Sequence, residues 1–115
     1  MSIRRVVPDI RSEDLEGSRE FYGLLGLVEV MNQGWVMTLA SPSNPTAQLT
    51  LMGADSTAAV QPDLSIEVDD VDAVYAAVTA GGAEIVHPLQ DEAWGVRRFF
   101  VIDPNGRVVN VVGHR

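Results

Sequence analysis

DLEGSREFYGLLG, residues 14–26, recurs in outline as DVDAVYAAVTAGG, residues 70–82. In both segments an Asp stands at a helix N-cap position and Gly supplies the stop. Between them an apolar stripe follows at helical spacing: Leu15, Phe21, Tyr22 and Leu25 in the first segment, and Val71, Val74, Tyr75 and Val78 in the second. The two Asp residues and the two closing Gly residues are each 56 positions apart, from 14 to 70 and from 26 to 82. A repeat near half of the chain length predicts two similar structural units.

The sequence around each helix predicts the same order of elements, βαβββ. Strands are expected at residues 3–11, 27–31, 35–40 and 47–52 in the first unit, and at 63–68, 83–86, 98–102 and 108–112 in the second. The fold class is therefore α+β, with tandem units at about 3–53 and 63–113 and a linker at 54–62, all within one domain of residues 1–115. Curved mixed sheets in two such units would enclose a cleft suited to a small molecule.

Composition excludes several classes of function. The chain has 115 residues, no cysteine and a formal charge of −8. Without cysteine it has no disulfide, thiolate metal site or cysteine nucleophile. The negative charge opposes binding to nucleic acid. No apolar run is long enough to span a membrane and no signal pattern begins the chain, so a cytoplasmic protein without a membrane partner is expected.

The N-terminal motif resembles a known signature. Residues 14–22 with Leu25-Gly26 match the D-L-x-x-S-x-x-F-Y…L-G pattern of the vicinal oxygen chelate superfamily, which includes glyoxalases, bleomycin resistance proteins and extradiol dioxygenases. The stretch WGVRRF at 94–99, followed by DPNG at 103–106, resembles the bleomycin-resistance-like branch. The resemblance covers nearly the whole chain and implies the glyoxalase/bleomycin resistance fold, with a homodimer as the expected assembly.

The resemblance also allows a test for a metal site. Catalytic members hold a divalent metal with one side chain from the first strand and one from the last strand of each unit. These positions fall on Val7, Asp63, Asn110 and, through the repeat at an offset of 62, Gln48. Valine has no donor atom and the two amides are uncharged, whereas such metals favour His and carboxylates. We therefore expect no metal and no other cofactor.

Three other residues lie close enough to replace a misassigned ligand: Asp9, Glu67 and His87. His87 precedes Pro88, so it is expected in a loop with its nitrogens in water. His114 is next to the C-terminal residue, where fraying is expected, and is discounted.

Strand alternation predicts which side chains line the cleft. Residues two apart on a strand point to the same side, so Leu49, Leu51, Val109 and Val111 are assigned to the core. The expected ligand-binding residues are Val7, Gln48, Thr50, Asp63, Ser65, Trp94 and Asn110. Trp94 and Trp35 are expected near the mouth, either as stacking surfaces or as plugs at a subunit contact. At least one of Arg97 and Arg98 is expected to pair with surface carboxylates.

Three functions fit these residues. The first is a metal-free protein that binds and sequesters a small molecule, such as an antibiotic-like compound or a metabolite. The second is a metal-independent enzyme that uses Asp63 or Glu67 as a general base. The third is a metal-dependent lyase, transferase or dioxygenase whose ligands lie elsewhere in the chain. The binding protein is the leading hypothesis, because the missing ligands are then expected.

Overall fold

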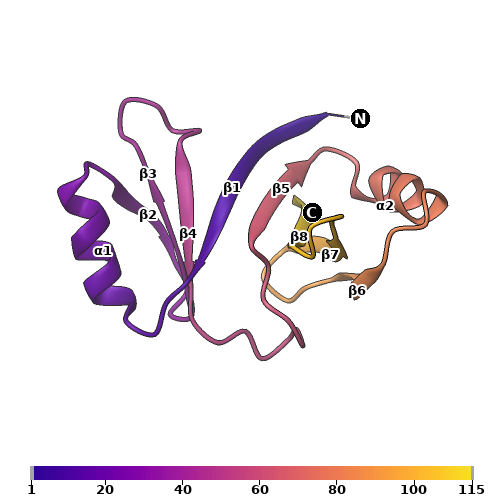
Figure 1. Ribbon diagram of the computed structural model, residues 1–115. Coiled ribbons are helices and arrows are strands. Elements are labelled where there is room, and N and C mark those ends of the chain that lie inside the picture. Colours follow the sequence, from indigo (N-terminus) through magenta and orange to yellow (C-terminus); the bar gives the residue numbers. More distant parts are fainter. Residues whose placement is uncertain (1, 115) are drawn as a thin grey trace. The chain divides into compact units, whose positions relative to one another are not determined.

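The computed structural model of the protein describes residues 2–114, and its elements follow the predicted order twice (Figure 1). The first set is β1 (Ile3–Arg11), α1 (Leu15–Leu24), β2 (Val28–Asn32), β3 (Val36–Ala40) and β4 (Gln48–Met52). The second set is β5 (Leu64–Val68), α2 (Val71–Ala80), β6 (Ile85–Asp91), β7 (Val96–Ile102) and β8 (Val108–His114). Neither helix within residues 2–114 has the length and apolar character needed to cross a membrane.

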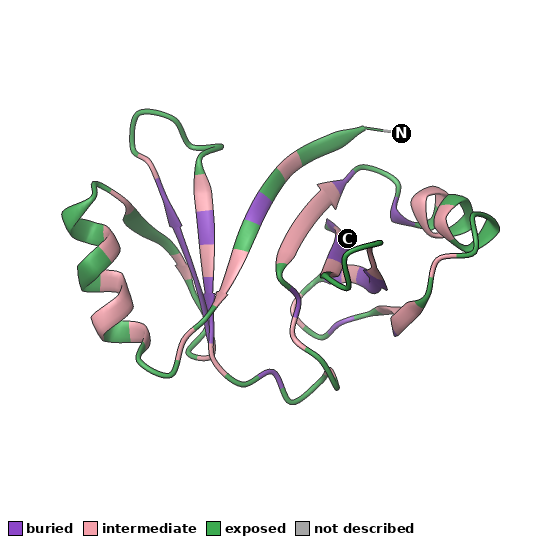
Figure 2. Ribbon diagram, in the orientation of Figure 1, coloured by how far each residue is buried: buried purple, intermediate pink, exposed green. Residues whose placement is uncertain are grey.

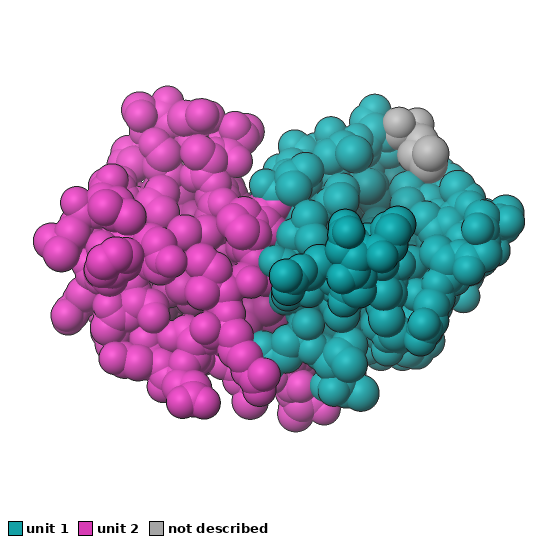
Figure 3. Space-filling model, in the orientation of Figure 1, with its two compact units in different colours: residues 1–6, 58–115 teal, residues 7–57 magenta. Residues whose placement is uncertain are grey.

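The chain forms two compact units (Figure 3). The first unit comprises residues 7–57, and the second comprises residues 1–6 together with 58–115. Strand β1 is divided between them, because its opening residues group with the second unit. Three hydrogen bonds within residues 2–114 hold that segment there. The Ser2 backbone N–H donates to the Asp69 carboxylate, the Asp69 backbone N–H donates to the Ser2 carbonyl, and Arg5 donates to Glu67.

In the first unit the strand order is β2-β3-β4-β1, with β1 parallel to β4 and the other neighbours antiparallel. Its core is made of Met37, Leu39, Leu49 and Leu51, which confirms the predicted inward side of β4. All of β3 is buried (Figure 2).

Helix α1 presents only part of its predicted apolar stripe to this core. Leu15 and Tyr22 pack against the core, but Phe21 is 57% exposed and Leu25 is 69% exposed. Leu15 and Tyr22 are seven residues apart, almost two full turns, so they share a face, whereas Phe21 is rotated by about 100° from Tyr22. Leu25 lies beyond the last helical residue. The prediction of one stripe was therefore wrong for Phe21 and Leu25, which lie outside the face that packs on the core.

In the second unit the strand order is β5-β8-β7-β6, with β5 parallel to β8 and the other neighbours antiparallel. Helix α2 covers one face of this sheet. Its predicted apolar positions are confirmed, since they all pack with Phe99 and Val111 of the sheet: Val71, Val74, Tyr75 and Val78.

The helix boundaries follow the repeated motif. Asp14 accepts a hydrogen bond from the Gly17 N–H at 2.9 Å, and Asp70 accepts one from Ala73 at 3.0 Å, as N-cap residues do. Gly26 and Gly82 have φ angles of 105° and 82°, a left-handed conformation that other residues rarely adopt. Both predicted N-caps and both predicted stops are confirmed.

Strand β6 differs most from the prediction. It runs to Asp91 and includes His87 and Pro88, where a loop was expected. β6 is last in the strand order and its register with β7 shifts twice, between Ile85 and His87 and between His87 and Gln90. Proline is tolerated at such edge and bulge positions, where its missing N–H disrupts little. The bulges also turn His87 to the same side as Phe100, which lies opposite it on β7.

Candidate functional site

The candidate site is one face of the sheet in the second unit. Since α2 packs on Ile66, Val68, Phe99, Val101, Val109 and Val111, their alternate neighbours point to the other side. We call this side the polar face, and it carries Ser65, Glu67, His87, Gln90, Arg98, Phe100 and Asn110. The register places them in two rows: Ser65, Asn110, Phe100 and His87 in one, and Glu67, Val112, Arg98 and Gln90 in the other.

Asn110 is the central polar residue of the first row. Its side chain is 9% exposed, and its Nδ2 donates a hydrogen bond to Ser65 Oγ at 2.9 Å. Its Oδ1 is buried and has no hydrogen-bond partner within residues 2–114. Buried amide oxygens are nearly always hydrogen-bonded in proteins, so this acceptor indicates a place for a further donor.

Glu67 starts the second row and is held between the side chains of Arg5 and His114. Its Oε1 accepts from Arg5 Nε at 2.7 Å, and its Oε2 lies 3.1 Å from Nε2 of His114. His114 ends strand β8, so the expectation of a frayed residue there was wrong. Both carboxylate oxygens of Glu67 are therefore engaged within the second unit.

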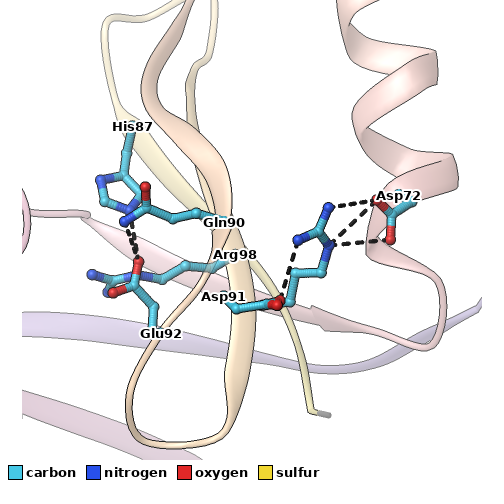
Figure 4. Close-up of polar contacts among 7 residues, drawn as sticks. Asp72, His87, Gln90, Asp91, Glu92 and Arg98 are labelled. Carbon is cyan, nitrogen blue, oxygen red and sulfur yellow. Dashed lines mark hydrogen bonds and ion pairs between the residues drawn. The ribbon is translucent and has the colours of Figure 1, made fainter.

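A buried cluster surrounds Glu92 where β6 turns into β7 (Figure 4). Glu92 Oε1 lies 3.0 Å from Nε2 of His87, accepts from Gln90 Nε2 at 2.9 Å, and forms an ion pair with Arg98 Nε at 3.4 Å. Glu92, His87 and Arg98 are 6%, 4% and 3% exposed. Since a carboxylate oxygen only accepts, the hydrogen bond assigns the proton to Nε2 of His87. The expectation that the nitrogens of His87 lie in water was wrong.

The environment of Glu92 favours its ionised form. Burial by itself would raise the pKa of Glu92, but hydrogen bonds from Gln90 and His87 and the positive charge of Arg98 outweigh it. The pKa of Glu92 therefore lies below its ordinary value of 4.5.

The two adjacent arginines of β7 point to opposite faces. The Arg98 guanidinium carbon lies 4.9 Å from the ring centre of Trp94 and 4.8 Å from that of Phe100, which are cation–π distances. Arg97 instead forms ion pairs with Asp72 at 3.0 Å and with Asp91 at 3.2 Å. Arg97 is thus the expected surface residue, and Arg98 fixes one side of Trp94.

The lowered pKa of Glu92 makes a pH-dependent contribution to stability. A carboxylate whose pKa is lower in the folded chain stabilises the fold above its unfolded pKa, and this contribution is lost as pH falls through the folded value. We expect the difference in unfolding free energy between the wild type and Glu92→Gln to be largest above about pH 5 and to shrink below about pH 4. Urea titrations of both proteins from pH 3 to 7 measure it. A difference that stays constant over this range would contradict the assignment.

In the first unit, the hairpin register corrects the alignment of Gln48 with Asn110. Thr38 pairs with Thr50 and Phe100 with Asn110, so Thr50 is the structural counterpart of Asn110. The first hairpin closes with a bond from Ser41 to Ala47, and the second closes with one from Asp103 to Arg107. The first loop is therefore two residues longer than the second. The difference in residue number between corresponding positions of the two units falls from 62 before this loop to 60 after it.

The predicted residues of the first unit lie on the face turned away from α1. Val7 is 3% exposed, and Thr50 lies opposite Asp9 with its hydroxyl 3.5 Å from that of Thr38. Gln48 begins β4, and its Nε2 donates to the carbonyl of Pro45 at 2.7 Å. Neither Val7 nor the hydroxyl of Thr50 supplies an ionised donor to this face.

Asp63 lies just before β5. One carboxylate oxygen accepts from the Val108 backbone N–H at 2.8 Å, and the other lies 4.0 Å from the guanidinium of Arg107. Its side chain is 45% exposed. Asp63 therefore helps to fix the register of β5 on β8 at the edge of the polar face.

The donor set does not suit the divalent metal that the resemblance implies. Of the positions assigned to ligands, Asp63 alone has a carboxylate, and that group binds the backbone. Within residues 2–114 no cluster of three or more His, Asp or Glu side chains is placed to bind one ion.

Three members of the Glu92 cluster were not predicted as site residues: Gln90, Glu92 and Arg98. The available signal was the spacing of His87, Gln90 and Glu92 before Trp94-Gly95, where Gly95 has a φ of 88° and permits a hairpin turn. A prediction that continued strand β6 through Pro88 would have placed these side chains beside Arg98. The bulges that bring His87 and Gln90 to one face have no clear sequence signature.

Comparison with known proteins identifies the family. The sequence profile of the Glyoxalase/Bleomycin resistance protein/Dioxygenase superfamily matches residues 2–111. The chain belongs to this superfamily, which confirms the resemblance seen in the sequence. No curated protein sequence matches the chain.

Solved structures with little sequence identity share the fold. A Legionella pneumophila protein described as an NAD-dependent benzaldehyde dehydrogenase is 17% identical, with a TM-score of 0.76 and coverage of 96% of this chain and 99% of that one. A superfamily member from Vibrio splendidus 12B01 is 17% identical, with a TM-score of 0.68 and coverage of 97% and 99%. Methylmalonyl-CoA epimerase from Mycobacterium tuberculosis is 21% identical, with a TM-score of 0.69 and coverage of 98% and 87%. These likenesses confirm the predicted α+β fold with tandem βαβββ units.

Proposed function

We propose that this member of the superfamily binds a small organic molecule without a divalent metal, and sequesters it rather than transforming it. The observation that carries the proposal is the amide of Asn110. It stands at the last-strand position where catalytic relatives place a metal-binding carboxylate. It is nine-tenths buried, and its Oδ1 lacks a protein donor within residues 2–114. A neutral acceptor at this point suits a ligand that donates a hydrogen bond.

The corresponding residue of the first unit supports the same proposal. Thr50 presents a hydroxyl where Asn110 presents an amide, so both last-strand positions are neutral. A metal of this class needs ionised or imidazole donors to bind tightly. Buried Val7, at the first-strand position, offers none.

The contacts of the two candidate bases favour binding over catalysis. Asp63 accepts a backbone N–H, and Glu67 is bound by Arg5 and His114. A general base needs an oxygen within reach of the proton that it removes. Here each carboxylate already has a structural partner, so base catalysis by Asp63 or Glu67 is the less favoured alternative.

Metal analysis tests the proposal. We expect purified protein to carry no stoichiometric zinc, manganese, nickel or iron, and its melting temperature to be the same with EDTA and with each added metal. A metal present at 100 times its dissociation constant would add about 2.7 kcal/mol to the free energy of unfolding, a shift that is readily measured. One transition metal per chain that EDTA removes with a fall in melting temperature would refute the metal-free proposal.

A further inference from the structure

The class of ligand follows from the hydrogen-bond donor that the polar face lacks. The unsatisfied group is an acceptor, because Asn110 directs its Nδ2 to Ser65 and leaves Oδ1 without a protein donor within residues 2–114. A molecule that meets Oδ1 must therefore present an N–H or O–H group.

The charged side chains on this face already have polar or charged partners within the second unit. Glu67 is bound by Arg5 and His114, and Glu92 is bound by Arg98 within the buried cluster. An anionic ligand at Asn110 would meet its carbonyl oxygen, and the carboxylate of Glu67 lies in the neighbouring row of the same face. A cationic ligand would have to displace an existing partner of Glu67. Neither charge is favoured, so the face is suited to a neutral molecule.

Apolar groups flank the amide. Val108 and Val112 are two residues away from Asn110 on the same face of β8, and Phe100 lies directly opposite it on β7. Val108 and Val112 are partly exposed and can contact a ligand. Phe100 is instead 0% exposed beside His87 and Arg98, and it backs the amide from within the fold. The part of the ligand next to its donor is therefore apolar.

We propose that the ligand is a neutral molecule with an apolar body and an N–H or O–H donor, which hydrogen-bonds to Oδ1 of Asn110. This inference rests on the proposed function, since it concerns the same residue. It also goes further, because it excludes carboxylates, phosphates and ammonium compounds as ligands of this face.

Two probes of nearly the same size and shape distinguish the contribution of the hydrogen-bond donor to binding from that of the apolar body. Indole has an N–H donor, and 1-methylindole replaces that hydrogen with a methyl group. We expect indole, titrated to millimolar concentration with EDTA present, to shift the NMR signals of the Asn110 side-chain amide and the Ser65 backbone amide. We expect 1-methylindole to bind at least about fivefold more weakly. Indole-3-carboxylate and tryptamine, the anionic and cationic arms, should also bind more weakly than indole.

The variant Asn110→Ala tests whether Asn110 causes the preference for indole over 1-methylindole. In Asn110→Ala the two neutral probes should bind equally, because the acceptor is gone. The matched control is Asn105→Ala in the exposed turn before β8, which should retain the wild-type ratio. If Asn110→Ala folds poorly, the comparison of indole with 1-methylindole on the wild-type protein still tests the proposal.

The outcomes distinguish this inference from the proposed function. Equal binding of the two neutral probes to wild type, preference for a charged probe, or no shift at Asn110 with any probe would overturn the ligand class. None of these results would be evidence that the protein binds a divalent metal, so the proposed function would stand. Binding of indole only after manganese or zinc is added would instead overturn the proposed function.

Discussion

Replacing Arg98 with alanine is expected to lower the free energy of unfolding by about 3 kcal/mol, because it leaves the buried carboxylate of Glu92 without its cationic partner. Arg98 is 3% exposed and lies between Glu92 and the rings of Trp94 and Phe100. His87 and Gln90 still donate to Glu92, which places the loss at the lower end of the usual range for broken buried pairs. The melting temperature should fall by on the order of 10 °C.

The neighbouring arginine is the matched control. Arg97→Ala breaks ion pairs whose carboxylates are 62% and 42% exposed, so it should cost less than about 1 kcal/mol. Urea denaturation followed by circular dichroism measures both variants. Equal losses for Arg97→Ala and Arg98→Ala would show that the buried cluster contributes no more than a surface pair.

Phe99→Ala is expected to cost about 3–5 kcal/mol, since it removes a fully buried ring from the core of the second unit. Phe99 is 0% exposed, and its ring meets that of Tyr75 edge to face at 5.1 Å. The cavity would lie between α2 and the sheet. Calorimetric melting is the simplest measurement, and a folded but much less stable protein is expected.

Phe21→Ala is the control for the same chemical change. Phe21 is 57% exposed, so its replacement should alter stability by less than about 1 kcal/mol. If Phe21→Ala proved as destabilising as Phe99→Ala, the exposed position of Phe21 on α1 would be wrong.

The helices could be predicted from the sequence because local chemistry determines their ends. Asp14 and Asp70 cap the first turns with their own side chains, and Gly26 and Gly82 end the helices with positive φ angles. Strand alternation likewise placed Leu51 and Val111 in the two cores, because in each unit described between residues 2 and 114 a helix packs on the side to which they point.

The Glu92 cluster could not be predicted because it depends on pairing between residues that are not neighbours in the sequence. Two bulges in β6 and the approach of Glu92 from the following turn decide whether His87 lies in water or in the buried cluster around Glu92. The counterpart of Asn110 depended on the length of one hairpin loop, and a two-residue difference moved it from Gln48 to Thr50. The meeting of the two units in a cleft around these residues stays a prediction.

The central claim is that the amide of Asn110 holds a small molecule without a metal. The most direct measurement is the melting shift produced by the most stabilising compound of a small-molecule screen, taken with EDTA and with manganese, for wild type and Asn110→Ala. We predict the same shift with EDTA and with manganese, and an affinity about 5- to 100-fold weaker in Asn110→Ala. A shift that requires manganese, or one that Asn110→Ala leaves intact, would contradict the claim.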